Sequence, residues 1–173
     1  MSTGLYTPPA ADQLARARAV LDSVTDPELP FLTIADMGIL RDVRVAGNTV
    51  EVAITPTYSG CPAMDVIALD IVTALTKAGF PEVRIERVLS PAWTTDWLTP
   101  PARAKLAANG IAPPQGRPDG SNSKRALFAE PAIVCPSCGS MATDRVSEFG
   151  STPCKAHYRC RTCREPFQYF KCI

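Results

Sequence analysis

The 173-residue chain lacks any long apolar segment. No stretch approaches the roughly 18–20 consecutive apolar residues that a membrane-spanning helix needs, so we expect no membrane span. The N-terminal residues hold no basic cluster followed by an apolar core, which is the pattern of a secretory signal. We therefore expect a cytoplasmic protein.

Histidine is nearly absent too, since His157 is the only one. The chain lacks the Glu and Glu-x-x-His sets that hold di-iron centres in helical bundles, and it lacks a Gly-rich fingerprint for a flavin or a nicotinamide. No Cys–His pair can be argued for Cys61, because the single histidine belongs to the other half of the chain. These absences argue against covalent catalysis and against oxygenation by this chain, and we expect no catalytic residue.

Proline and cysteine, by contrast, are abundant. The chain has 17 prolines among 173 residues, and this share is about twice the usual ~5%. It predicts many turns and an extended connector. Of 7 cysteines, 6 lie after residue 134, and without an export signal this clustering favours metal binding over disulfides. Hydrophobic residues make up 46% of the chain, which excludes wholesale disorder.

Charge divides the chain where the cysteines do. Residues 1–114 carry a net charge of −3 and residues 115–173 carry +4. A polar run rich in Pro, Gly and Ser separates them and has no apolar period. The sequence therefore predicts a first domain of residues 1–112, a linker of residues 113–127 and a small module of residues 128–173.

The first domain is predicted to be a small α+β sandwich, in the order helix, strand, strand, helix, strand. Apolar residues at helical spacing predict helices over 11–24 and 62–78. Alternating residues predict a hairpin over 43–54 and a third strand over 83–88. A further short helix is expected near 101–109.

The C-terminal module carries two C-x₂-C pairs separated by 21 residues, Cys135 with Cys138 and Cys160 with Cys163. Two intervening residues let a tight turn present both thiolates to one ion, and two such pairs make a tetrahedral S₄ site that suits structural Zn²⁺. Iron or an iron–sulfur cluster is the alternative metal, and disulfides or free thiols are the alternatives to metal. We expect a zinc ribbon with a hairpin over 142–158, because so short a module seldom folds unaided.

Three further residues of the tail have more than one interpretation. Cys154 and Cys172 are small apolar residues of a ribbon strand, or metal ligands in place of a cysteine of the two pairs, or an accessory thiol pair for a cluster. His157 is either a substitute ligand, three residues before Cys160, or an exposed strand residue.

The tail also interleaves basic and aromatic residues. Such a surface is suited to nucleic acid phosphates, but aromatic strands also form a ribbon's own core or a protein-binding face, and the charge of the tail is modest. A zinc-ribbon nucleic-acid binder is therefore an alternative function. The residues are Lys155, Tyr158, Arg159, Arg161, Arg164, Phe167, Tyr169, Phe170 and Lys171.

Cys61 stands apart, in the loop that joins the hairpin to the second predicted helix. Pro62 suits the first helical position, which places Cys61 at or near the N-cap, where the helix dipole lowers the pKa of a thiol. The hydroxyls of Thr57 and Ser59 are candidate hydrogen-bond donors to it. From chemistry alone, Cys61 is either a buried inert residue or a reactive or metal-binding thiolate.

Acidic turns precede the hairpin, at Asp26 with Glu28 and at Asp36. They are either ordinary turn residues with solvated carboxylates or groups that face a metal or hydrogen-bond at the Cys61 loop.

Several of these motifs resemble a known family. Three of them are similar to the iron–sulfur assembly domain shared with bacterial SufT: Asp26-Pro27-Glu28, Asp36-Met37-Gly38-Ile39 and Thr55-Pro56-Thr57-Tyr58-Ser59-Gly60-Cys61-Pro62. Three more narrow the resemblance to the PaaD family of phenylacetate-degradation proteins, which are associated with the multicomponent phenylacetyl-CoA epoxidase: residues 90–97, residues 110–114 and the tail from 149 to 172.

The resemblance implies an accessory role. PaaD-like proteins are thought to help mature an iron–sulfur or iron centre of the epoxidase system, with the iron–sulfur reductase component as the expected partner, and not to be its catalytic subunit. By position, the resemblance makes Cys61 the candidate thiol for a transient cluster. It places Asp26, Glu28 and Asp36 around that thiol, with Thr57 in the same loop.

The tail cysteines match the metal-binding pairs of the same family. The alternative is a non-catalytic subunit that only scaffolds the epoxidase. A homodimer would bring two Cys61 loops to one cluster, although the sequence does not show it.

Overall fold

The computed structural model describes residues 10–115 and 133–172. The chain forms two compact units, Met1–Trp93 and Thr94–Ile173. The boundaries predicted for the first domain, the linker and the C-terminal module stay a prediction, since most of the linker lies outside the described residues.

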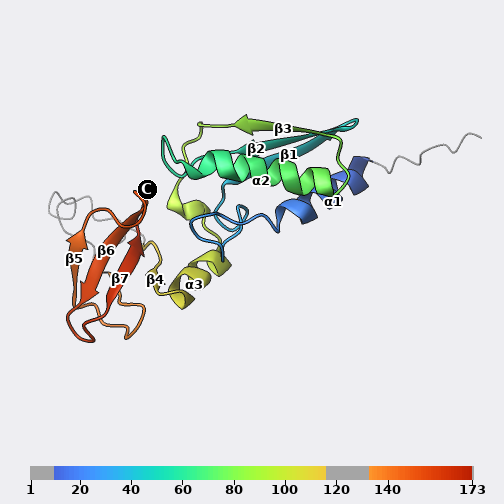
Figure 1. Ribbon diagram of the computed structural model, residues 1–173. Helices are drawn as coiled ribbons and strands as arrows, with labels where there is room; N and C mark the ends of the chain where they lie inside the picture. The colour runs from blue at the N-terminus through green and yellow to red at the C-terminus, as the bar shows by residue number, and fades with distance from the viewer. Residues whose placement is uncertain (1–9, 116–132, 173) are drawn as a thin grey trace, which may run out of the picture. The chain divides into compact units, whose positions relative to one another are not determined.

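The first unit is a three-stranded sheet with two helices on one face (Figure 1). β1 pairs antiparallel with β2, and β2 pairs parallel with β3. The expected α-β-β-α-β order and the α+β class are confirmed. The elements are α1 (Ala10–Leu21), β1 (Leu40–Ala46), β2 (Thr49–Ile54), α2 (Ala63–Lys77) and β3 (Glu82–Arg87).

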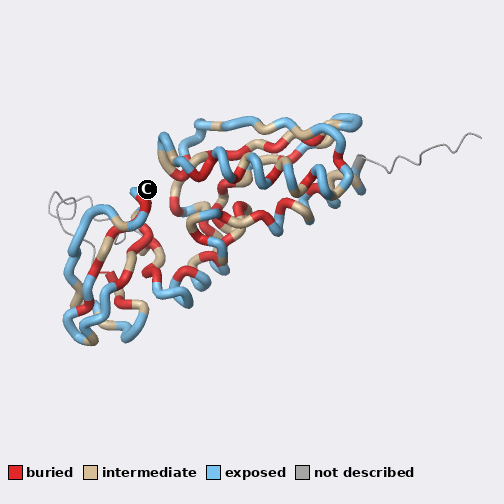
Figure 2. Tube along the Cα trace, viewed as in Figure 1, coloured by how far each residue is buried: buried red, intermediate tan, exposed pale blue. Residues whose placement is uncertain are grey.

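Alternation along the strands explains why one face of this sheet is covered. In β2, Val50, Val52 and Ile54 are buried, while the residues between them are partly exposed. α2 buries one stripe of residues, which includes Ile67 and Ile71, and exposes the opposite stripe, so its trace alternates between buried and exposed in Figure 2. The core of the unit lies between these two layers.

α1 is shorter than predicted, ending at Leu21 rather than at residue 24. The N–H groups of Ser23 and Val24 donate to carbonyls three residues back, those of Val20 and Leu21, at 3.1 Å each. This tightening ends the α-helix. Val24 nevertheless stays buried. The apolar spacing therefore predicted its burial correctly and its helical conformation wrongly.

The second unit contains a 3-10 turn, a short helix and a four-stranded sheet in the order β4-β7-β6-β5. The expected helix begins at Pro100, where the Thr99 hydroxyl caps it by accepting from the Ala102 N–H at 3.2 Å. The pairing of β4 with β7 was not predicted from the sequence. The elements are η1 (Thr95–Trp97), α3 (Pro100–Ala108), β4 (Ile111–Ala112), β5 (Thr143–Ser147), β6 (Lys155–Cys160) and β7 (Pro166–Phe170).

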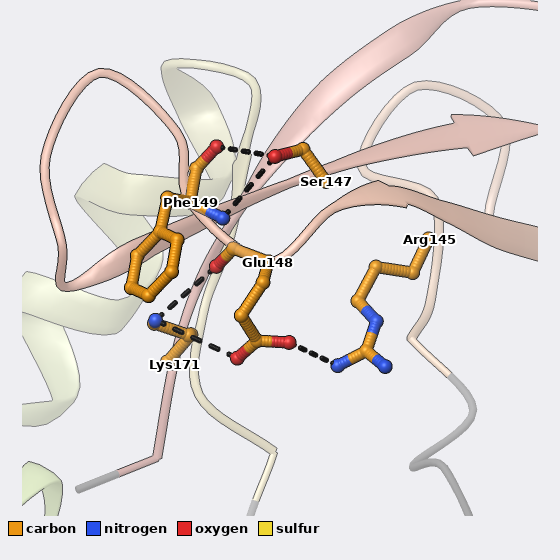
Figure 3. A network of polar contacts seen from close by, with 5 residues as sticks. All are labelled: Arg145, Ser147, Glu148, Phe149 and Lys171. Carbon is orange, nitrogen blue, oxygen red and sulfur yellow. Dashed lines mark hydrogen bonds and ion pairs between the residues drawn. The ribbon is translucent and has the colours of Figure 1, made fainter.

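The expected ribbon hairpin is formed by β5 and β6, and its turn is tied to the end of β7 (Figure 3). The Lys171 ammonium lies 4.5 Å from the centroid of the Phe149 ring and donates to the Glu148 backbone carbonyl at 3.2 Å. The Glu148 carboxylate in turn pairs with Arg145. The Ser147 hydroxyl donates to the Phe149 carbonyl at 2.9 Å. These contacts hold the turn in one conformation.

Among the described residues, no helix has the length and apolar character needed to cross a bilayer.

We predict that Ile71→Ala lowers the free energy of unfolding of the first unit by about 2–5 kcal/mol, because it leaves a cavity under α2. Thr73→Ala, on the exposed stripe of the same helix, should change it by less than about 0.5 kcal/mol. Urea unfolding, followed by the fluorescence of buried Trp93 in a Trp97→Phe background, measures both. Equal unfolding midpoints for the two variants would contradict this packing.

Candidate functional site

The four cysteines of the C-x₂-C pairs converge in the second unit. Their sulfur atoms all lie within 4.8 Å of one another. The Sγ atoms of Cys135 and Cys163 are 3.7 Å apart, and those of Cys138 and Cys160 are 3.6 Å apart. A disulfide needs about 2.05 Å between sulfur atoms, so these cysteines are not cross-linked in pairs.

The spacing fits a single tetrahedral ion. With metal–sulfur bonds of about 2.3 Å, a regular ZnS₄ tetrahedron has sulfur–sulfur edges of about 3.8 Å. The observed short separations match that edge within about 0.2 Å. The donor set is also the one that structural zinc and iron–sulfur centres use.

The two turns that carry these cysteines are built alike. The first cysteine of each turn donates its N–H to a carbonyl five residues on, Cys135 to Ser140 at 2.9 Å and Cys160 to Glu165 at 3.0 Å. The residue after the second cysteine is left-handed in both, with φ of 73° at Gly139 and 69° at Arg164. The same backbone conformation therefore orients both pairs of sulfur atoms toward one point.

Further contacts join the turns, and one of them favours thiolate at Cys160. The hydroxyls of Ser140 and Thr162 lie 2.8 Å apart, which connects one turn with the other. The pKa of Cys160 is lowered to about 6, chiefly because the Cys163 backbone N–H hydrogen-bonds its sulfur. Cys135 and Cys160 belong to the buried core of the ribbon, with Tyr158, Phe167 and Tyr169.

The remaining candidates of the tail lie outside the four-thiol group. Cys154 is buried with its sulfur 2.9 Å from the Thr152 hydroxyl. Cys172 is exposed and lies 3.3 Å from the Tyr169 hydroxyl. His157 is half-buried on β6, opposite Gln168.

Cys61 lies in the first unit, in the loop between β2 and α2. Pro62 is the N-cap of α2, so Cys61 precedes the cap by one residue. Its N–H donates to the Tyr58 carbonyl at 3.2 Å, and its own carbonyl accepts from Met64 at 3.4 Å. Gly60 permits this turn with a φ of 86°. The thiol is half-buried.

The expected lowering of the Cys61 pKa is wrong. Burial of the thiol raises its pKa, and the negative charge of Glu28 adds to that rise. Hydrogen bonds from the Ala63 backbone and from the side chains of Thr57 and Tyr58 act in the opposite direction but do not prevail. The thiol therefore carries its proton at neutral pH, and a metal must displace that proton to bind.

The acidic candidates do two different things. Asp26 is buried and its Oδ1 accepts from the backbone N–H groups of Glu28 and Leu29 at 2.8 and 2.9 Å. The Asp36 carboxylate accepts from the Thr33 N–H at 3.2 Å, and the Thr33 hydroxyl accepts from the Asp36 N–H at 3.0 Å. Both carboxylates thus organise turns. Of the three acidic candidates, Glu28 is the one whose charge raises the pKa of the Cys61 thiol.

Within the described ranges 10–115 and 133–172, the tail cysteines are the one group of metal-binding side chains that is already assembled. Cys61, Asp26, Glu28 and Asp36 do not form a second such group there. Sequence reasoning also missed Tyr58, which contacts the thiol where Ser59 was expected to. Its position three residues before Cys61, at the start of a tight turn, was the available signal.

Two family models match separate parts of the chain. The model described as "Iron-sulfur cluster assembly protein" matches residues 14–88, and the model described as "PaaD zinc beta ribbon domain" matches residues 119–171. The fold is also similar to the crystal structure of a DUF59 domain from Bacillus anthracis, with a TM-score of 0.53 and 26% identity over 56% of this chain and 93% of that one.

Two curated proteins are also similar to the chain. An "Fe-S protein maturation auxiliary factor" of Porphyromonas gingivalis is 33% identical over 50% of this chain and 84% of its own length. A subunit of the "Putative 1,2-phenylacetyl-CoA epoxidase" of Escherichia coli is 48% identical over 95% of this chain and 96% of that protein. On this near full-length similarity and the two domain matches, the chain belongs to the PaaD family of phenylacetyl-CoA epoxidase subunits.

Proposed function

We propose that this protein is a maturation factor that delivers an iron–sulfur cluster to a component of the multicomponent phenylacetyl-CoA epoxidase and is not itself the enzyme. The observation that carries the proposal is the presence of two different cysteine sites in one chain: a closed four-thiol site and a single half-buried thiol on a loop. The similarity to the iron–sulfur assembly family supports it.

The two sites suit opposite tasks. Four thiolates around one ion leave no open position, which favours permanent structural binding. A carrier must release its cargo, so it needs few ligands and an accessible thiol. Cys61 meets that requirement, and Thr57 and Glu28 act on its thiol. Asp26 and Asp36 are proposed as further groups of this site.

The metal of the ribbon is proposed to be Zn²⁺. Cys135, Cys138, Cys160 and Cys163 would hold it, and their sulfur spacing fits its tetrahedral geometry. A bound zinc ion would supply stability to the ribbon and no chemistry. The ribbon then serves as a docking arm, and the iron–sulfur reductase component is the recipient that we propose.

Metal and acid-labile sulfide per chain, measured on anaerobically purified protein, test the assignment of the two sites. We expect about one zinc in the unaltered protein and in Cys61→Ser, because one S₄ site holds one ion. Iron and sulfide should occur in the unaltered protein alone. Iron and sulfide that survive Cys61→Ser would place the cluster in the tail instead.

A second variant pair tests the closed site. Cys160→Ser should lose the zinc and unfold the ribbon, since structural zinc contributes on the order of 10 kcal/mol to small domains of this kind. Cys172→Ser, which changes a cysteine outside the group, should keep both zinc and fold. Zinc analysis and NMR dispersion of the ribbon amides report the result, and an intact zinc content in Cys160→Ser would refute the four-cysteine site.

The competing role is that of a scaffold without cluster chemistry. A scaffold keeps epoxidase activity when Cys61 is replaced by Ser, whereas a cluster carrier loses most of it. The assay is the oxygenation rate of the epoxidase matured in cells that carry either variant. Full activity with Cys61→Ser, at equal protein levels, would favour the scaffold.

A further inference from the structure

Exposed apolar side chains lie beside the Cys61 loop. Val66 and Leu69 are 45% and 65% exposed on the outer stripe of α2. They follow Pro62 at helical spacings of four and three, so they continue along the helix from the residue next to Cys61. Neither side chain contributes to the buried core of the unit.

A third exposed apolar residue belongs to the same end of the unit. The Arg87 guanidinium, on the last residue of β3, pairs with the Asp65 carboxylate in the first turn of α2. Figure 1 shows α2 beginning at the end of the sheet where β3 finishes. Leu89, 70% exposed, follows Arg87 by two residues.

The position of these residues is informative because it is selective. Single exposed apolar residues are ordinary on protein surfaces. In the described part of the first unit, however, three large apolar side chains are exposed, those of Val66, Leu69 and Leu89. Val66 lies in the first turn of α2, Leu69 lies about one turn further along the helix, and Leu89 follows β3 by two residues. Val66 and Leu89 are thus close in the chain to the ion pair that joins α2 and β3.

The charges around this surface are mostly negative. Asp65 and Asp70 are exposed on α2, and Glu28 adds a negative charge beside Cys61. Arg87 already pairs with Asp65. Residues 1–93 as a whole hold 7 Lys+Arg and 11 Asp+Glu, a net charge of −4.

We infer that Val66, Leu69 and Leu89, named here the α2 docking surface, bind the protein that receives the cluster from Cys61. This inference rests on the proposed carrier function and adds the chemistry of the partner: an apolar contact face with a rim of Lys and Arg. A second copy of this chain is the poorer occupant, because symmetric contact would bring two acidic rims together.

Binding of the apo form of the iron–sulfur reductase component, measured anaerobically by calorimetry, tests this surface. Leu69→Lys should weaken binding about tenfold or more, because it places an ammonium in an apolar contact and opposite a basic rim. Thr76→Lys is the matched control, since Thr76 is also exposed on α2 but lies in its last turn, two turns beyond Leu69. The control should bind within about twofold of the unaltered protein.

Salt dependence tests the predicted charge of the partner. Binding of the unaltered protein should weaken as ionic strength rises, and Asp70→Lys should both weaken binding and flatten that dependence. Equal affinities for Leu69→Lys and Thr76→Lys, or no binding by the unaltered protein, would overturn the inference. So would light scattering that shows a dimer which Leu69→Lys dissociates, because the surface would then belong to a second copy.

Cluster content separates this inference from the proposed function. Leu69→Lys should keep the iron and sulfide of the unaltered protein, since it leaves Cys61 in place. Binding lost in Leu69→Lys, with iron and sulfide absent from the unaltered protein, would refute the carrier role while the docking surface stands. Iron and sulfide lost only in Cys61→Ser, with Leu69→Lys binding normally, would refute the docking surface alone.

Discussion

The convergence of four sulfur atoms within 4.8 Å is the constraint on which the C-terminal ribbon depends. Its core is a small cluster that includes two of the four cysteines, and modules of this size seldom bury enough apolar surface to fold unaided. Matching backbone hydrogen bonds and matching left-handed residues in the two turns aim the sulfur atoms at one point. The hairpin and its tied turn then complete a small unit, and a metal held by the four thiols would add to its stability.

Cys61 is under the opposite constraint. The loop ahead of α2 gives the thiol hydrogen-bond donors, yet burial and Glu28 keep its pKa raised. A protonated, half-buried thiol binds metal only when a proton leaves, and a single thiol leaves coordination positions open that the four-thiol group would fill. That contrast is the physical basis for assigning permanent structural binding to one site and transfer to the other.

The sheet of the first unit brings these features to one end. Because β2 and β3 are parallel, the loop after β2 and the residues after β3 lie at the same end of the sheet. The Asp65–Arg87 ion pair joins that end of β3 to the first turn of α2. Thus Cys61, the first turn of α2 with Val66, and Leu89 lie at one end of the sheet, although they are distant in sequence.

The sequence by itself determined the order of the elements, the sandwich and ribbon class, and the four tail cysteines, because apolar periodicity and C-x₂-C spacing are local patterns. It did not determine the end of α1, where apolar spacing continued to Val24 beyond the last helical hydrogen bond. The pairing of β4 with β7 and the contact of Tyr58 with Cys61 were decided only in the folded chain. The pKa of Cys61 was decided there too, because it depends on burial and on a carboxylate more than thirty residues away in the chain, and neither is visible in local sequence.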